Sequence, residues 1–318
     1  MKLKVKKQLE DKKGKKSIFR FFSPKYWPLH IGLLLLKIVA LLPPILRKKL
    51  AKGLGHLMLK YASKRRHIAK TNISRCFPEL SKNEQQRLLQ KNFLAMGKTF
   101  IEMACCWFSD LESQKRKTTI VGQEHLDAAL GKGNGVILLI FHMTSIEMGG
   151  SLLASYYDFH AMYKPNKNPL LEKAITQGRA RHNKKMLDRN NPRAMIKALK
   201  NNEIVWYSTD QNYGGKTATF VPFFGIETST ITATTKLAKL TGASVVPFTQ
   251  RRLDDIDEYE LTIHPEFKSF ASESEVVDAT QINQFLESYL RKYPVDYMWL
   301  HQRFRTRPNG VNDFYENS

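Results

Sequence analysis

The residues best suited to chemistry lie in Gly135–Gly150, GVILLIFHMTSIEMGG. A continuous apolar run of strand length ends at His142, and Glu147 follows where a helix is expected to begin. Residues five apart within one helix would point about 140° away from each other, so this spacing joins imidazole and carboxylate only across a loop. An imidazole at a strand end, oriented by a carboxylate, can take a proton from an attacking hydroxyl. The spacing therefore predicts general-base chemistry by His142 and Glu147.

Both residues also have a purely structural interpretation, which the spacing leaves open. Thr144 and Glu147 match a capping box, in which the carboxylate would satisfy helix amides. His142 could be a hydrogen-bonded histidine at the edge of a sheet. A zinc site is not favoured, because no third ligand lies nearby and the spacing differs from that of helical His pairs.

A second polar cluster follows the apolar run that begins at Ile204. The glycine pair in this cluster permits close approach of the backbone to a ligand, and its amides are candidates for stabilising an oxyanion. For each of these residues taken alone, an ordinary loop remains the alternative. The substrate-binding candidates of this cluster are Asp210, Gln211, Gly214, Gly215 and Lys216.

Two further features complete the candidate site. Arg179 lies beside Arg181 on a predicted helix, where a guanidinium could bind a phosphate or simply face solvent. The aromatic residues of the later stretch TFVPFFG suit either the wall of an acyl groove or core packing. The acyl-groove candidates are Phe220, Phe223 and Phe224.

These residues need a scaffold that brings strand ends together. After Thr118 the sequence alternates between strand and helix patterns, which predicts a mixed, largely parallel sheet flanked by helices. Ligand sites in such sheets lie at the carboxyl ends of strands. The expected strands are 136–141, 159–163, 204–208, 243–249, 259–264 and 297–301. The expected helices are 147–157, 169–186, 192–199, 231–240 and 281–293.

The sequence before the sheet predicts a membrane anchor. Residues 1–25 carry ten Lys and Arg, and residues 27–46 are mostly apolar and long enough to cross a bilayer core of ~30 Å. Lys37 near the middle of this segment weakens a clean span, and Pro43 and Pro44 should break the helix near its end. The helix is therefore expected either to span the membrane or to lie in its interface, with a buried core helix as the alternative.

The expected organisation has five parts. One of them is a helical region that contains a capping box formed by Ser81 and Glu84, and this region should pack on the sheet domain. The parts are a basic tail at 1–25, the anchor at 26–50, the helical region at 51–117, the α/β domain at 118–308 and a C-terminal tail at 309–318.

The composition favours an anionic partner in a reducing compartment. The 318 residues carry a formal net charge of +22, which suits an acidic membrane, an acidic protein or a nucleic acid. No nucleic-acid-binding motif is recognisable, so a nucleic-acid partner is not expected. The three cysteines, Cys76, Cys105 and Cys106, fit a cytoplasm-facing protein without disulfides.

Taken together, these motifs resemble the lipid A biosynthesis late acyltransferases, the lauroyl and myristoyl transferases that act on Kdo-lipid A precursors. The resemblance implies His142 and Glu147 as a catalytic pair and Arg179 and Asp210 as further essential residues. It also implies a fold similar to the glycerolipid acyltransferases, acyl carrier protein thioester as co-substrate without a cofactor, and an inner-membrane enzyme whose active site faces the cytoplasm. The motifs are Asn72–Pro78, His142-x4-Glu147, Arg179, Asp210-Gln211, Gly214–Gly225 and Trp299–Pro308.

The expected reaction is direct acyl transfer. His142, assisted by Glu147, would deprotonate a hydroxyl that attacks the thioester carbonyl, and no activated Ser or Cys nucleophile is needed. A related membrane acyltransferase with a lysophospholipid or glycolipid acceptor is the alternative, and a basic, membrane-tethered nucleic-acid-binding protein is a remote one. The acyl length and the acylated hydroxyl depend on side-chain arrangements that the sequence does not reveal.

Overall fold

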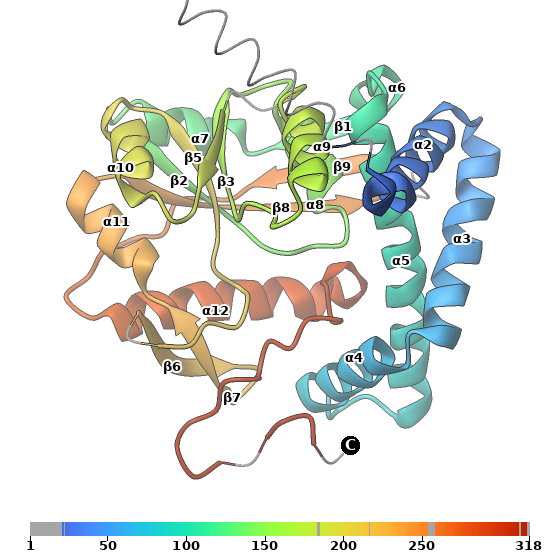
Figure 1. Ribbon diagram of the computed structural model, residues 1–318. Coiled ribbons are helices and arrows are strands. Elements are labelled where there is room, and N and C mark those ends of the chain that lie inside the picture. The colour runs from blue at the N-terminus through green and yellow to red at the C-terminus, as the bar shows by residue number, and fades with distance from the viewer. Residues whose placement is uncertain are drawn as a thin grey trace, which may run out of the picture.

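The computed structural model describes residues 21, 23–182, 185–215, 217–253, 258–311 and 313–316. Most of the predicted basic tail and the candidate Lys216 lie outside these residues. A seven-stranded sheet has the strand order β1-β9-β8-β2-β5-β3-β4. Figure 1 shows helices on both sides of this sheet. Its strands are β1 (Thr118–Val121), β2 (Val136–Ile140), β3 (Phe159–Tyr163), β4 (Lys185–Asp188), β5 (Ile204–Ser208), β8 (Ser244–Arg252) and β9 (Tyr259–Ile263).

The pairing of these strands confirms the predicted mixed, largely parallel sheet. Every neighbouring pair is parallel except β8 and β9. The central strand β2 is buried on both faces, which explains its uninterrupted apolar sequence. Ile137 and Leu139 enter one hydrophobic core, whereas Leu138 and Ile140 enter the core on the other face.

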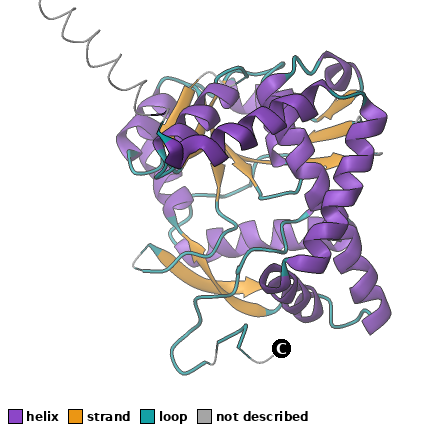
Figure 2. Cartoon of the chain, turned by 45° about the vertical axis from the view of Figure 1, so that its right-hand side comes forward, coloured by secondary structure: helices purple, strands orange, loops and turns teal. Residues whose placement is uncertain are grey.

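Helices cover both faces of the sheet. One core is covered by α7 (Gln123–Leu130), α8 (Ile146–Leu153) and α9 (Pro169–Arg179). The other is covered by α10 (Pro192–Lys200), α11 (Ala233–Thr241) and α12 (Glu275–Lys292). A separate antiparallel hairpin of β6 (Ala218–Phe223) and β7 (Ile226–Ile231) packs against α12, below the main sheet in Figure 2.

A bundle of N-terminal helices stands beside the sheet. The capping box of Ser81 and Glu84 begins α5 as predicted. Gly55 and Gly97 let α3 and α5 approach backbone to backbone, because a Cβ on Gly97 would lie 2.2 Å from the carbonyl oxygen of Ala51. The elements are η2 (Pro24–Tyr26), α2 (Trp27–Leu41), α3 (Pro44–Tyr61), α4 (Ser63–Cys76), α5 (Lys82–Phe108) and α6 (Glu112–Arg116).

The expected anchor is divided between two helices. The predicted break at Pro43 and Pro44 is confirmed, since α2 ends at Leu41 and α3 begins at Pro44. Among the described residues, no helix combines the length and the apolar character needed to cross a bilayer. The prediction of a transmembrane helix therefore finds no support in the fold.

Two predicted elements are wrong. The expected helix 169–186 ends at Arg179, and Met186 lies in β4, a four-residue strand whose only buried residue is Leu187. Such a strand carries too little apolar pattern to be separated from the preceding helix. The expected strand 297–301 is an irregular segment with one isolated bridge, between Met143 and Tyr297, because it crosses the strand ends instead of joining the sheet.

Candidate active site

The ends of β2 and β5 bring the first two functional side chains together. These strands pair in parallel with Ile140 opposite Ser208. His142 and Asp210 each follow two residues later, so they lie side by side beyond the edge of the sheet. His142 opens onto a cavity of about 240 Å³. The polar residues lining this cavity include His142, Glu147, Lys164, Arg179, Arg189, Gln211 and Tyr213.

His142 is oriented by Asp210. The ring Nδ1 of His142 lies 2.7 Å from Oδ1 of Asp210, and the His142 backbone N–H donates to Oδ2 at 2.7 Å. Burial would raise the pKa of Asp210, but the charge and the hydrogen bonds of His142 outweigh burial and lower that pKa below its ordinary value. An ionised carboxylate at Nδ1 fixes the tautomer whose Nε2 is free to accept a proton.

Glu147 has different partners from those expected. Its carboxylate accepts two hydrogen bonds from Arg179, at 2.9 Å from Nε and 2.8 Å from Nη2, and one at 3.0 Å from Nε1 of Trp107. Burial favours a raised pKa, but the hydrogen bonds and charge of Arg179 outweigh it, so the pKa of Glu147 is lowered. Glu147 thus shares the cavity with His142, while Asp210 orients the imidazole.

The capping alternative for Glu147 is also not realised. The helix α8 begins after Ser145, whose side chain makes no capping hydrogen bond. The hydroxyl of Thr144 instead accepts a hydrogen bond of 2.8 Å from Nη1 of Arg252. The carboxylate of Glu147 is instead bound to Arg179 and lines the cavity.

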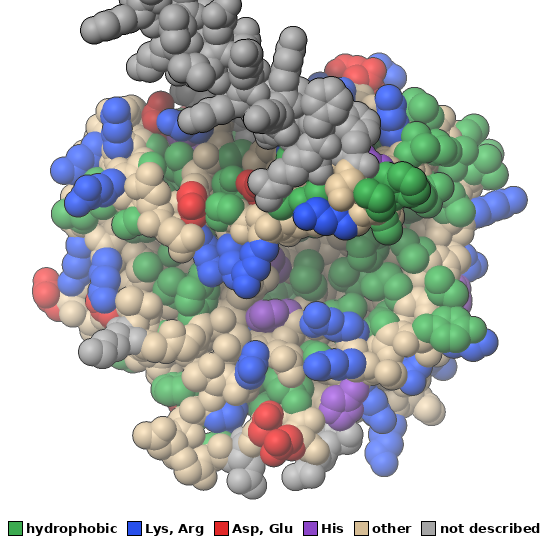
Figure 3. Space-filling model, in the orientation of Figure 1, with side chains coloured by type: hydrophobic (Ala, Val, Ile, Leu, Met, Phe, Trp, Pro, Cys, Tyr) green, Lys and Arg blue, Asp and Glu red, His purple; other side chains and the backbone are tan. Residues whose placement is uncertain are grey.

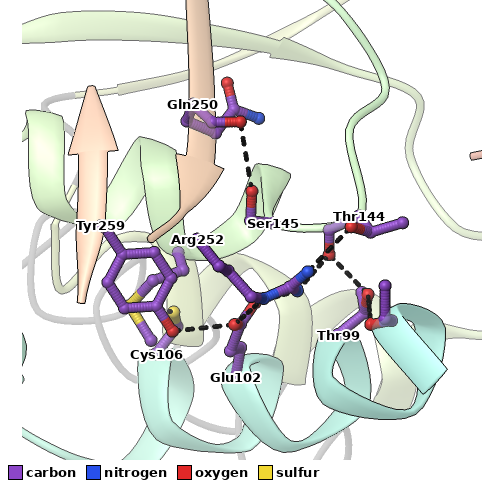
Figure 4. Close-up of polar contacts among 10 residues, drawn as sticks. Thr99, Glu102, Cys106, Thr144, Ser145, Gln250, Arg252 and Tyr259 are labelled. Carbon is purple, nitrogen blue, oxygen red and sulfur yellow. Dashed lines mark hydrogen bonds and ion pairs between the residues drawn. The ribbon is translucent and has the colours of Figure 1, made fainter. Parts of the chain in front are cut away.

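A buried ion pair supports the loop between His142 and α8, as the close-up in Figure 4 shows. Arg252 on β8 forms a bidentate pair with Glu102 on α5, and their side chains are only 6% and 2% exposed. Arg252 also donates to the carbonyl oxygen of Thr144 at 2.8 Å, and Tyr259 donates to Glu102 at 2.8 Å. Contacts between residues that are 108 to 157 positions apart thus fix the loop that carries His142.

The segment after α12 ties both strand ends together. The N–H of Met298 donates to the carbonyl oxygen of His142 at 3.0 Å, and the hydroxyl of Tyr297 donates to that of Asp210 at 3.1 Å. Arg303, fully buried, reaches the carbonyl oxygen of Gln211 at 3.3 Å. The motif that begins at Trp299 therefore belongs to the segment whose hydrogen bonds hold the two strand ends of the site in place.

The other predicted site residues divide into three groups. Arg179 and Gln211 line the cavity with His142, whereas Gly214 and Gly215 lie in the following loop outside the lining. Phe223 and Phe224 are buried and pack in the core below the sheet, and Phe220 is 36% exposed on the hairpin. Phe223 and Phe224 thus follow the core-packing alternative, and none of the three phenylalanines lines the cavity.

Lys164 and Arg189 are lining residues that sequence reasoning missed. Lys164 follows β3 directly, and Arg189 follows β4. Because the sequence predicts a helix up to residue 186, it does not mark Arg189 as the residue that follows a strand. A strand prediction at Lys185–Asp188 would have found it by the same rule that found His142.

The two carboxyl groups predict a loss of stability in acid. The pKa values of Glu147 and Asp210 lie below their ordinary values of 4.5 and 3.8. Because the folded pKa is depressed, the stability from each group is fully present above its ordinary value and is lost as the pH falls through the folded pKa. The free energy of unfolding should therefore decrease as the pH falls from about 5 to about 2, and it should decrease less steeply in Glu147→Gln. Urea denaturation across this range measures it, and an identical pH profile for the variant would contradict the assignment.

The fold and the site together define a class of enzyme. An imidazole bonded to a buried carboxylate lies at the carboxyl edge of a mixed sheet and opens onto a cavity. An imidazole held in this way can act as a general base that takes the proton from a hydroxyl before the hydroxyl attacks a group to be transferred.

Comparison with known proteins identifies the family. The family model described as bacterial lipid A biosynthesis acyltransferase matches residues 14–306. The chain is 37% identical over 293 residues to the lipid A biosynthesis lauroyltransferase of Escherichia coli K12, covering 92% of this chain and 96% of that protein. It is 33% identical over 296 residues to the palmitoleoyltransferase of the same organism, covering 93% and 96%. A lipid A biosynthesis acyltransferase of Haemophilus influenzae is 36% identical over 294 residues, covering 91% and 94%. The chain therefore belongs to the bacterial lipid A biosynthesis acyltransferases.

Proposed function

We propose that the protein transfers a fatty acyl group from an acyl carrier protein thioester to a hydroxyl of a Kdo-lipid A precursor. The observation that carries this proposal is the His142–Asp210 pair beside a cavity lined by cations, in a chain of this family. Both substrates are anionic, through the acidic carrier and the phosphates of the lipid, which suits a net charge of +22. On the face in Figure 3, Lys and Arg side chains border a hollow near the centre.

The chemistry requires one proton relay. Nε2 of His142 takes the proton of the acceptor hydroxyl, and the oxygen attacks the thioester carbonyl to form a tetrahedral intermediate. When the intermediate collapses, the C–S bond breaks, the new C–O ester bond remains, and the imidazolium returns the proton to the leaving sulfur. Asp210 stabilises the imidazolium throughout. Glu147, held by Arg179, completes the charged wall of the same cavity.

An acyl-transfer assay tests the function. Purified protein in detergent is incubated with labelled acyl carrier protein thioesters and a mixture of tetraacyl Kdo-lipid A precursor and lysophospholipid. Mass spectrometry should find the added acyl group on the lipid A precursor. Transfer to the lysophospholipid alone would overturn the proposed acceptor.

We also propose that the protein works on the cytoplasmic face of the inner membrane, held there by α2 and the start of α3. Six apolar residues recur at helical spacing along α2 and are 47–73% exposed. They form the hydrophobic patch over α2 at the upper right of Figure 3. An amphipathic helix with such a face and adjacent lysines binds an anionic lipid surface without crossing it. The six residues are Trp27, Ile31, Leu34, Leu35, Ile38 and Leu41.

Charge introduced on this face is expected to release the protein from lipid. Leu34→Glu combined with Ile38→Glu should reduce flotation with anionic vesicles about tenfold or more, because each change removes apolar burial and adds repulsion. Val277→Glu on α12, 58% exposed, is a matched control that should float like the wild type. Equal flotation of all three proteins would refute attachment through α2.

A further inference from the structure

Two cations that line the catalytic cavity occupy neighbouring backbone positions at the ends of two strands. β3 and β4 pair in parallel with Tyr163 opposite Asp188, and the N–H of Arg189 donates to the carbonyl oxygen of Tyr163 at 2.9 Å. Lys164 and Arg189 are therefore the first residues beyond two neighbouring strand ends. Both are exposed, and both line the cavity that contains His142.

These two cations differ from Arg179 in having free donors. Arg179 donates hydrogen bonds from Nε and Nη2 to Glu147, so the carboxylate of Glu147 already balances most of the positive charge of Arg179. The side chains of Lys164 and Arg189 make no hydrogen bond or ion pair with any other residue that the structure describes. The phosphate-binding role that the sequence suggested for Arg179 thus fits Lys164 and Arg189 better.

A second cavity begins at Arg189. It has a volume of about 430 Å³ and shares Met162, Arg189 and Tyr213 with the catalytic cavity. Beyond these shared residues its wall is mostly apolar and comes largely from α10 and α11, including Ile196 and Leu240. A polar reaction cavity and an apolar groove therefore meet at one exposed guanidinium.

We propose that Lys164 and Arg189 bind a phosphate of the acceptor lipid and that the adjoining groove holds one of its acyl chains. This proposal rests on the proposed function and specifies how its acceptor binds. A guanidinium and an ammonium provide charged donors for phosphate oxygens, and a hydrocarbon chain is stabilised by an apolar wall. The shared guanidinium places the two ligand groups next to each other, as they are in a phosphorylated, acylated lipid.

The relative position of the two cations and the apolar groove fits the acceptor lipid better than the thioester donor. In a carrier-bound thioester, the phosphate of the prosthetic arm and the acyl chain lie on opposite sides of the reacting carbonyl. If the thioester donor bound here, its reacting carbonyl would lie at His142. The phosphate and the acyl chain of the donor would then extend to opposite sides of His142. In this protein Arg189 lies where the catalytic cavity meets the groove, so phosphate and chain are on the same side of the reaction centre.

Kinetics with two forms of the acceptor test the phosphate site. Arg189→Gln should raise KM for the phosphorylated precursor about tenfold, the effect of one charged hydrogen bond, and leave kcat and the donor KM unchanged. Lys164→Gln should act in the same direction. Both variants should match the wild type on a precursor whose phosphates have been removed. Arg193→Gln, an exposed cation on α10 that lines neither cavity, is the matched control and should show no change.

The groove is tested by chain length. Leu240 is 58% exposed at the groove, so Leu240→Gln should fold normally and raise KM for a long-chain precursor more than for a short-chain analogue. The same relative change for both lengths would overturn the groove assignment.

Direct binding separates failure of this proposal from failure of the proposed function. The dissociation constant of the phosphorylated precursor in detergent micelles should rise about tenfold in Arg189→Gln, whether or not acyl transfer is observed. A rise in the donor KM instead would assign the cations to the carrier arm and overturn the proposal. Equal losses with the dephosphorylated precursor, or Arg189→Gln behaving like Arg193→Gln, would overturn it as well. A wild type that binds the precursor but acylates none of the acceptors would overturn the function alone.

Discussion

Asp210→Asn is expected to lower kcat about 10²–10³-fold while KM for both substrates stays nearly constant. The asparagine would keep its oxygen for the backbone N–H of His142 and turn its amide N–H₂ toward Nδ1. Nδ1 would then have to accept, which places the ring proton on Nε2, where the acceptor hydroxyl needs a base. The geometry of the site would be retained, but His142 would no longer adopt the tautomer whose Nε2 can accept a proton.

The measurement is steady-state kinetics with the variant and with Asp158→Asn. Asp158 is exposed after α8, so its replacement makes the same chemical change outside the cavity. Thermal unfolding of the three proteins separates loss of activity from loss of fold. Wild-type kcat in a folded Asp210→Asn would show that His142 does not depend on its carboxylate partner.

Glu147→Ala is expected to abolish detectable transfer and to destabilise the protein by roughly 2–3 kcal/mol. The change leaves Arg179 and the indole N–H of Trp107 without their acceptor. The cost should be below the value of about 3–5 kcal/mol for fully buried pairs, because the Arg179 side chain is 32% exposed. Activity and stability would therefore fall together, and the single variant could not tell a catalytic role from a structural one.

The double variant Glu147→Gln with Arg179→Gln separates the two roles. It removes both charges at once and keeps hydrogen-bonding groups of similar size, so most of the lost stability should return. Transfer should not return if the carboxylate itself acts on the substrates. Recovery of both properties would make Glu147 a purely structural residue.

The sequence predicted that His142 and Asp210 follow strand ends, but it did not predict that they pair with each other. An apolar run that ends in a polar residue was enough to place His142 and Asp210 at strand ends, because parallel strands share one carboxyl edge. Which carboxylate meets the imidazole depends on the register between β2 and β5, where Ile140 faces Ser208. Register is a property of two distant segments, and one sequence gives no measure of it.

The features that sequence reasoning missed involve distant residues or weak local patterns. The pair of Glu102 and Arg252 joins α5 to β8 across 150 positions, and neither residue stands in a local motif. Arg189 was missed because β4 is too short to show a strand pattern. Local signals were reliable where the physics is local, as at the Ser81 capping box and the break at Pro43.

Single-turnover acyl transfer by His142→Ala measures whether His142 is the base that takes the proton from the acceptor hydroxyl. A labelled acyl carrier protein thioester is mixed with excess enzyme and Kdo-lipid A precursor, and formation of the acylated lipid is followed over time. The rate should be about 10³–10⁴-fold below that of the wild type, with unchanged binding of both substrates and an intact fold. Transfer at the wild-type rate by the folded variant would show that another group removes the proton and would contradict the assignment of His142 as the base.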